Sequence, residues 1–311
     1  MKPLLLVFCV LGDDHRAQIS RHYELRYAPK PADAAAQLAA CDPRARVVLT
    51  TGSIGLSEQA IDALPCLELV CALGVGYENI ALPRLRERGI VLANGAGTNA
   101  DSVADHAMGL LLAAVRKLAW LDAQVRRGLW RDDIPMPADV SGRRLGLLGL
   151  GDIGRGIARR AAAFNLPIGY CARRPREDVD YAYFPTARDL ARWCDFLVVA
   201  TPGGPDTRHL VDAPVLEALG PDGVLVNIAR GTVVDTRALA DALRAGRLAA
   251  AGLDVYEDEP LPPGVLLDLP GVILTPHVGG SSPSAVQNSV DRFLDNAAGH
   301  FAGRGPVSPV P

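Results

Sequence analysis

The feature that most constrains how this chain can fold is a glycine-rich turn at residues 149–154, with the sequence Gly-Leu-Gly-Asp-Ile-Gly. Residues 144–148 before it are mostly apolar and predict a buried strand, and residues 155–163 after it have the apolar spacing of a helix. At such a junction the first glycine permits a tight turn, the second lets a pyrophosphate approach the backbone, and the third allows close packing of helix on strand. The helix N-terminus adds unpaired N–H groups and a positive dipole. The sequence therefore predicts a dinucleotide-binding unit.

Short, uninterrupted apolar runs recur along the rest of the chain. The predicted strands are residues 4–10, 46–50, 68–73, 89–92, 144–148, 167–171, 196–200, 224–228, 251–255 and 272–274. Runs that do not alternate with polar residues are typical of parallel strands covered on both faces. The chain of 311 residues is long enough for two domains, and a turn-forming cluster at residues 94–97 separates two sets of strands. We therefore predict an α/β protein with two doubly wound parallel-sheet domains.

Helical patterns lie between most of these strands, as at residues 32–40, 58–63 and 235–245, where Asp235 can cap the helix start. One long helix is predicted over residues 101–126, because no cluster of Gly or Pro interrupts the pattern. Trp130 follows it; we expect a packed Trp at the helix end, and closure of a ligand pocket is the alternative.

Composition excludes several classes of function. A charged fraction of 22% and an apolar fraction of 49% describe a compact globular protein, and a net charge of -3 gives no reason to expect nucleic acid or an anionic membrane as partner. No apolar stretch approaches the roughly 20 residues that span a bilayer, and the N-terminal run lacks a cleavage site, so we expect a cytoplasmic protein. The cysteines show no metal-type spacing, so we predict no metal site and buried free thiols. They are Cys9, Cys41, Cys66, Cys71, Cys171 and Cys194.

The end of the strand at residues 167–171 bears on which dinucleotide binds. An acidic residue about 20 residues beyond the turn would hold the ribose of NAD, but here the strand runs into Ala172, Arg173 and Arg174. Arginine side chains match a phosphate, so NADP (NADPH) is favoured and NAD remains possible. The alternative is that both arginines are ordinary surface residues.

Three downstream segments, residues 227–231, 253–260 and 274–280, each follow a predicted strand at its carboxyl end, where open α/β sheets place ligands. They would bring one Arg, one acid and one His together. Arg230 and His277 are the candidates, and purely structural roles are their alternatives. The acid could be any of Glu257, Asp258 and Glu259, which lie together. Glu257 and Asp258 are expected to be solvated loop charges, and only its position before Pro260 singles out Glu259. Of the other histidines, His106 is expected to pack, and surface positions are expected for His15, His22, His209 and His300.

These motifs, with residues 74–80 and 102–106, resemble the D-isomer-specific 2-hydroxyacid dehydrogenase family, and within it the glyoxylate/hydroxypyruvate reductases. The resemblance spans nearly the whole chain. It implies a flavodoxin-like substrate domain of residues 1–98 plus 285–311, a Rossmann dinucleotide-binding domain of residues 99–284, and an active-site cleft between them. It also implies a homodimer formed through residues 101–137.

The resemblance implies that Arg230, Glu259 and His277 are catalytic. His277 would donate a proton when a 2-oxo acid is reduced by hydride from NADPH to a D-2-hydroxy acid; Glu259 would orient the ring, and Arg230 would bind the substrate carboxylate. The implied cofactor contacts are Val103, Gly149, Gly151, Asp152, Ile153, Gly154, Arg173, Arg174, Thr201, Pro202, Thr207, Ile228, Ala229, Arg230, Asp254, His277 and Gly279. The implied substrate contacts are Gly52, Ser53, Gly74, Val75, Gly76, Arg230 and His277.

The loop at residues 51–55 is small and uncharged, which disfavours phosphorylated substrates. The resemblance implies small acids, such as glyoxylate and hydroxypyruvate. Bulkier acids, such as 2-ketogluconate or aryl pyruvates, are one alternative. The other is a dinucleotide-sensing, corepressor-like binding protein, because such relatives share the motifs. Two residues depart from the family pattern: Asp105 stands where Glu is common, and Gly204 where Thr is frequent.

Overall fold

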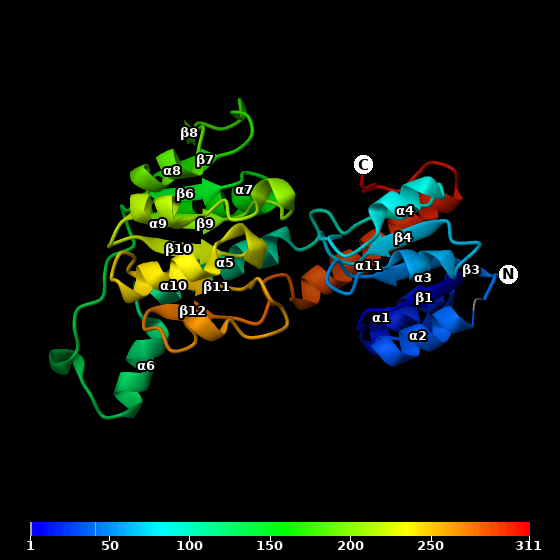
Figure 1. Ribbon diagram of the computed structural model, residues 1–311, viewed down its shortest axis with the longest axis horizontal. Helices are drawn as coiled ribbons and strands as arrows, with labels where there is room; N and C mark the ends of the chain where they lie inside the picture. The colour runs from blue at the N-terminus through cyan, green and yellow to red at the C-terminus, as the bar shows by residue number, and fades with distance from the viewer. Residues whose placement is uncertain (1, 41) are drawn as a thin grey trace. The chain divides into compact units, whose positions relative to one another are not determined.

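The computed structural model describes residues 2–40 and 42–311 (Figure 1). The chain divides into two compact units, which we call the first and second unit. The first is made of Met1–Asn99 and Ser281–Pro311, and the second is Ala100–Gly280. The predicted domain limits lie within a few residues of these divisions.

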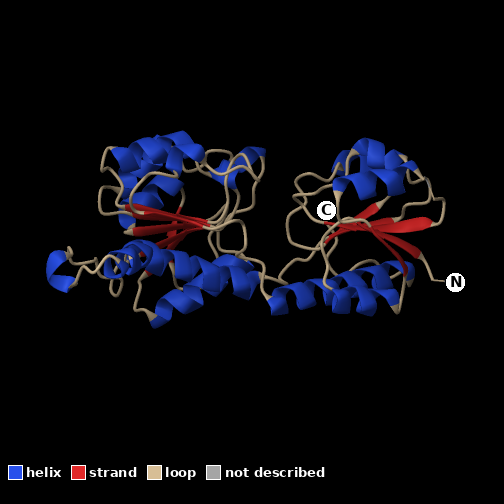
Figure 2. Cartoon of the chain, turned by 90° about the horizontal axis from the view of Figure 1, so that it is seen from below, coloured by secondary structure: helices blue, strands red, loops and turns tan. Residues whose placement is uncertain are grey.

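The first unit contains a five-stranded sheet in the order β2-β1-β3-β4-β5, with every strand pair parallel. Helices cover both faces (Figure 2). The strands are β1 (Leu4–Val7), β2 (Glu24–Tyr27), β3 (Ala45–Thr50), β4 (Leu69–Ala72) and β5 (Val91–Ala93). The helices are α1 (Asp13–Ser20), α2 (Pro31–Ala39), α3 (Glu58–Asp62), α4 (Leu82–Glu87) and α11 (Pro283–Phe301). Strand β2 was not predicted, because it is an edge strand without a buried residue and so has no apolar run.

The second unit contains a seven-stranded sheet in the order β12-β11-β10-β9-β6-β7-β8, again with every pair parallel. The strands are β6 (Leu145–Leu148), β7 (Ile168–Cys171), β8 (Ala182–Phe184), β9 (Phe196–Val199), β10 (Val224–Asn227), β11 (Ala250–Leu253) and β12 (Val272–Leu274). The helices are α5 (Ala100–Val115), α6 (Leu118–Arg126), α7 (Asp152–Ala163), α8 (Ala187–Trp193), α9 (Ala213–Leu219) and α10 (Thr236–Arg244). Short 3-10 turns are η1 (Arg131–Asp133), η2 (Pro205–Thr207), η3 (Gly231–Val233) and η4 (Gly264–Leu266).

Strand order reverses between β6 and β9, and a ligand of an open α/β sheet binds beyond the carboxyl ends of the strands at such a point. The glycine-rich turn directly follows β6. The predicted α/β class with two doubly wound parallel sheets is therefore confirmed.

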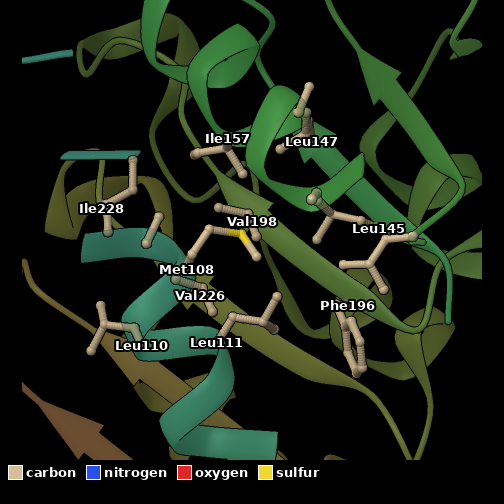
Figure 3. Packing of buried hydrophobic residues seen from close by; sticks show 14 of the residues in the cluster. Met108, Leu110, Leu111, Leu145, Leu147, Ile157, Phe196, Val198, Val226 and Ile228 are labelled. Carbon is tan, nitrogen blue, oxygen red and sulfur yellow. The ribbon is translucent and has the colours of Figure 1, made fainter. Parts of the chain in front are cut away.

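Helix α5 packs its apolar face on this sheet, where Met108 and Leu111 lie among Leu147, Val198 and Val226 (Figure 3). The prediction of one helix over residues 101–126 was wrong. The helix is interrupted at Lys117, whose backbone is left-handed with φ of 54°. Lys117 occupies the N-cap position of α6. The buried face of α5 ends at Val115, and most of α6 is exposed. Beyond Val115 there is therefore no hydrophobic core on which α5 could continue to pack.

The cysteines within the described residues are free thiols, as predicted, but they are not all buried. Cys9, Cys71 and Cys194 are buried, and burial raises the pKa of Cys9 and of Cys194 to about 12. Cys171 is half-buried, whereas Cys66 is exposed, so the prediction of burial was wrong there. Cys41 lies outside the described residues. No helix in the described part of the chain is long and apolar enough to cross a membrane.

Candidate active site

The glycine-rich turn has three glycines with three different surroundings. Gly149 has φ of 105°, and a Cβ there would lie 2.7 Å from the carbonyl oxygen of Ala200. A Cβ at Gly154 would overlap the carbonyl oxygen of Gly149. At Gly151, by contrast, an added Cβ would meet no heavy atom within 4 Å among the described residues. The first and third glycines therefore pack the turn, and the second leaves open surface at the N-terminus of α7.

This arrangement fits a dinucleotide pyrophosphate. The open backbone at Gly151 begins a 12-residue helix, whose first N–H groups have no partners within the helix. Asp152 and Ile153 form the first turn of that helix. The residues of the turn are therefore placed as a phosphate cradle requires.

Two arginines lie near this turn, at the end of the neighbouring strand β7. The turn and the strand end are joined by a hydrogen bond of 2.9 Å from the N–H of Gly149 to the carbonyl oxygen of Cys171. Arg173 and Arg174 follow and are exposed. Their loop is tied to α7 by Arg155, whose guanidinium lies 2.9 Å from the carboxylate of Asp178.

The Arg, Glu and His predicted to be catalytic follow three adjacent strands. Arg230 comes after β10, Glu259 after β11 and His277 after β12, so all three lie beyond the carboxyl edge of one sheet. His277 Nδ1 lies 2.7 Å from Glu259 Oε2. The other oxygen, Oε1, accepts a 2.8 Å hydrogen bond from the N–H of Tyr256. Among the three acids left open by the sequence, the structure pairs Glu259 with the histidine.

The pair is electrostatically matched. The hydrogen bond to Glu259 raises the pKa of His277 above its ordinary value, although burial and the charge of Arg230 act in the opposite direction. Burial would raise the pKa of Glu259, but the hydrogen bonds from His277 and Tyr256 and the charges of His277 and Arg230 outweigh it, so that pKa is lowered. The arrangement therefore favours imidazolium beside carboxylate, which is a proton donor held in one orientation.

The loop that carries His277 is held by Asp254, whose side chain is almost fully buried. His277 has φ of 53°, a strained conformation for this residue type, and its N–H donates to the carbonyl oxygen of Asp254 at 2.8 Å. Asp254 Oδ1 accepts from the hydroxyl of Thr275 at 2.6 Å and from the N–H of Val278 at 2.9 Å. Its Oδ2 accepts from the N–H of Gly279 at 2.8 Å. Besides the nicotinamide contact implied for Asp254, this residue therefore fixes the His277 loop.

His106 belongs to the same network, which the sequence did not reveal. Its Nε2 lies 2.9 Å from the hydroxyl of Thr275 and 3.3 Å from Asp254 Oδ1. Nearby on α5, the hydroxyl of Ser102 donates to the carbonyl oxygen of Gly279 at 2.7 Å. The motif at residues 102–106 was the available signal. The structure shows His106 packed against a buried carboxylate, a partner that the sequence did not predict.

Another histidine also has a partner that the sequence did not reveal. His209 and Glu257 were expected to be a surface residue and a solvated loop charge, but His209 Nε2 lies 2.8 Å from Glu257 Oε1 and both side chains are partly buried. No motif contains both residues, so only the tertiary structure reveals the pair.

The predicted substrate residues of the first unit lie at its own carboxyl edge. Gly52 and Ser53 follow β3, and Gly74, Val75 and Gly76 follow the adjacent strand β4. A Cβ at Gly52 would lie 2.5 Å from the carbonyl oxygen of Gly76, so the two loops pack backbone against backbone. Hydrogen bonds to the carbonyl oxygens of Gly74 and Val75 fix the second loop. Substrate binding by these residues stays a prediction.

Other predicted cofactor contacts also lie near strand ends in the second unit. Thr201 and Pro202 follow β9, and the hydroxyl of Thr207 in η2 donates to the carbonyl oxygen of Pro202 at 2.9 Å. Ile228 and Ala229 follow β10 and are buried, and Val103 is buried on α5. Gly204 has φ of 132°, where the Thr frequent in the family would be strained.

Asp105, which stands where Glu is common in the family, forms an ion pair of 2.6 Å with Arg160 on α7. The described residues contain no group of three or more His, Cys, Asp or Glu that could hold a metal ion.

Comparisons with known proteins agree with this geometry. A family model described as the NAD binding domain of D-isomer specific 2-hydroxyacid dehydrogenase matches residues 108–279. The chain is 43% identical over 266 residues to glyoxylate/hydroxypyruvate reductase A of Arabidopsis thaliana, covering 85% of each protein. It is 38% identical over 308 residues to hydroxyphenylpyruvate reductase of Plectranthus scutellarioides, covering 98% of each.

A solved structure resembles the whole chain. It is the NADPH-dependent glyoxylate/hydroxypyruvate reductase of Sinorhizobium meliloti in complex with NADP and malonate, with a TM-score of 0.91 and 38% identity over 100% of this chain and 97% of that one. The strand order, the paired Glu and His, and these similarities over nearly full length lead to one assignment. The chain belongs to the D-isomer specific 2-hydroxyacid dehydrogenase family.

Proposed function

We propose that this protein reduces small 2-oxo acids, such as glyoxylate and hydroxypyruvate, to D-2-hydroxy acids with NADPH. The observation that carries the proposal is the 2.7 Å contact between His277 and Glu259. The charge of Arg230 acts on this pair, and all three residues lie in loops of the sheet that also carries the dinucleotide turn. Two named reductases that align over most of this chain support the substrate class.

The chain's own residues divide the chemistry between them. When bound, the nicotinamide supplies the hydride for the carbonyl carbon. His277 Nδ1 faces Glu259, so Nε2 is the nitrogen that delivers a proton to the carbonyl oxygen. Glu259 keeps the ring protonated and oriented. Arg230 binds the substrate carboxylate and stabilises the negative charge that develops on the oxygen.

The cofactor preference rests on Arg173 and Arg174. Both are exposed at the end of β7, the strand next to β6, where a 2'-phosphate of NADP would find two guanidinium groups and no carboxylate of the kind that holds an NAD ribose. The NADP complex of the S. meliloti reductase supports this preference.

We further propose that the protein is a homodimer, formed through α6 and the segment that follows it. This region extends away from the sheet of its own unit (Figure 1). It exposes large apolar side chains that a monomer would leave in water: Leu118, Trp120, Val125, Leu129, Trp130 and Met136. Trp130, which was predicted to pack at a helix end, is 65% exposed in the single chain. A second copy would cover it. A cytoplasmic location stays a prediction.

Reduction of bulkier acids is the second candidate function. The 38% identity to a hydroxyphenylpyruvate reductase over 98% of both chains favours aryl pyruvates as the acids to compare first. Both candidates use the same catalytic residues and differ only in substrate size.

A spectrophotometric panel tests the proposal. Glyoxylate, hydroxypyruvate, 4-hydroxyphenylpyruvate and 2-ketogluconate are supplied with NADPH or NADH, and kcat/KM is measured for each pair. We expect the highest values for the two small acids with NADPH. Higher values for the bulky acids would replace the substrate assignment, and equal or better use of NADH would contradict the role of the two arginines. No turnover with any of these acids would favour a binding protein.

A further inference from the structure

A hydrogen-bonded His–Glu pair outside the catalytic set lies close to that set in the chain. His209 Nε2 is 2.8 Å from Glu257 Oε1, and the two side chains are 34% and 22% exposed. His209 adopts φ of 50°, which is unusual for a residue other than glycine. Strained backbone of this kind persists only where surrounding contacts hold it. The pair is therefore a built feature of the fold.

The pair connects the loops after three adjacent strands. His209 lies in the loop after β9, and its N–H donates to the carbonyl oxygen of Thr232, after β10, at 2.8 Å. Glu257 lies after β11, and its Oε2 accepts from the N–H of Thr236, at the start of α10, at 3.1 Å. The two oxygens of Glu257 thus hold the β11 loop to the two neighbouring loops.

This loop also carries the partner of the proton donor. Glu259 is two residues beyond Glu257, and its Oε1 is bonded to the N–H of Tyr256, which precedes Glu257. The peptide between Tyr256 and Glu257 packs so tightly on Gly231 that an added Cβ would overlap it. Gly231 directly follows Arg230. A shift of Glu257 would therefore move the backbone that positions Glu259.

We propose that His209 and Glu257 are positioning residues, which hold the 254–260 loop so that Glu259 meets His277 Nδ1. This inference rests on the proposed function, because it assigns these residues a part in presenting the proton donor. Neither is a catalytic residue. They act through Glu259, and their loss weakens the Glu259–His277 hydrogen bond and the protonation that it supports.

The surroundings of the pair allow its side chains to be truncated without disrupting the hydrophobic core. A cavity of about 590 Å³ opens beside it, lined by His209, Glu257, Arg208, Asp235 and other polar residues. Arg208 lies 3.9 Å from Glu257 Oε1, and Asp235 lies 3.9 Å from His209 Nδ1. Because the ring borders this polar cavity, truncating it exposes the site to water and does not empty an apolar core.

The test compares His209→Ala with His209→Gln, in which the amide can still donate to Glu257. The pKa of His277 is measured by NMR titration of its imidazole, and kcat and KM for reduction of glyoxylate by NADPH are measured across pH. His300→Ala is the matched control, because His300 is also partly buried near a glutamate, Glu68, but lies in the first unit.

For His209→Ala we expect a lower pKa of His277, a kcat about tenfold lower at neutral pH, and a KM for glyoxylate within about twofold of wild type, because Arg230 is unchanged. The alkaline limb of the kcat profile moves to lower pH. The Gln variant stays near wild type, and Glu257→Ala combined with His209→Ala adds little to either alone.

The inference is overturned if His209→Ala changes neither the pKa of His277 nor the alkaline limb of the kcat profile. A fall in kcat alone would not support it, because general destabilisation would have the same effect. Movement of both in His300→Ala would overturn it as well. The NMR titration does not depend on turnover. If wild type reduced none of the acids, the proposed function would fail while the positioning of His277 could still be decided.

Discussion

The two units use the same sheet edge in different ways. At the carboxyl edge of the first unit, the loops with Gly52 and Gly76 touch backbone to backbone. At the corresponding edge of the second unit, Arg230, Glu259 and His277 are linked by charge. A parallel sheet supplies the edge in both cases, and at the second edge a hydrogen-bonded His–Glu pair can move a proton. The difference supports the prediction that the first unit recognises the shape of the substrate and the second carries out the chemistry.

Replacement of His277 should break the chemistry of the second edge most completely. His277→Ala removes the proton donor, and we expect kcat for 2-oxo acid reduction to fall about 1,000-fold, within the range for general acid catalysis. The measurement is steady-state turnover of glyoxylate with NADPH, with exposed His22→Ala as the control. Turnover close to wild type would show that another group donates the proton.

Replacement of Glu259 should have a smaller effect and a characteristic pH signature. Because Glu259 raises the pKa of His277, Glu259→Gln lowers that pKa, and less of the ring is protonated at neutral pH. Reduction requires the protonated ring, so we expect kcat to fall about 30-fold at neutral pH and its alkaline limb to move to lower pH. Oxidation of the D-2-hydroxy acid requires the neutral ring and should lose less. An alkaline limb at the wild-type pH would contradict the electrostatic role.

The smallest effect tests the edge of the first unit. In Gly52→Ala the new Cβ would overlap the carbonyl carbon of Gly76, so the two loops must separate. We expect KM for glyoxylate to rise about tenfold, with kcat changed less than in either second-unit variant, because the proton donor is intact. Gly12→Ala, at an exposed position of the same unit where the added carbon makes only ordinary contacts, is the control. If kcat fell and KM stayed constant, the division between the two edges would be wrong.

Much of the fold could be predicted because buried parallel strands have uninterrupted apolar sequences. The runs at residues 144–148 and 196–200 correspond to β6 and β9 within one residue at each end. The strands that were missed are edge strands, β2 of the first sheet and β8 of the second. Neither has a buried residue, so their sequences lack an apolar run. The break at Lys117 was missed because neither Gly nor Pro marks it.

The candidate site divides along the same line. Arg230 and His277 could be proposed as candidates because each lies shortly after a strand, where local sequence predicts a loop at the sheet edge. Three acids stand together at residues 257–259, and in the sequence only the position before Pro260 favoured Glu259 as the partner of His277. The structure pairs the third of them with His277 and the first with His209.

The sequence by itself determined the strand, turn and helix around Gly149, the parallel two-sheet architecture, and the residue types available for proton transfer. It could do so because burial and backbone conformation are encoded over a few neighbouring residues. Only the tertiary structure decided that His106 faces Asp254 and that His209 binds Glu257. These contacts join residues far apart in the chain, and strand order, which no local pattern contains, determines which loops meet.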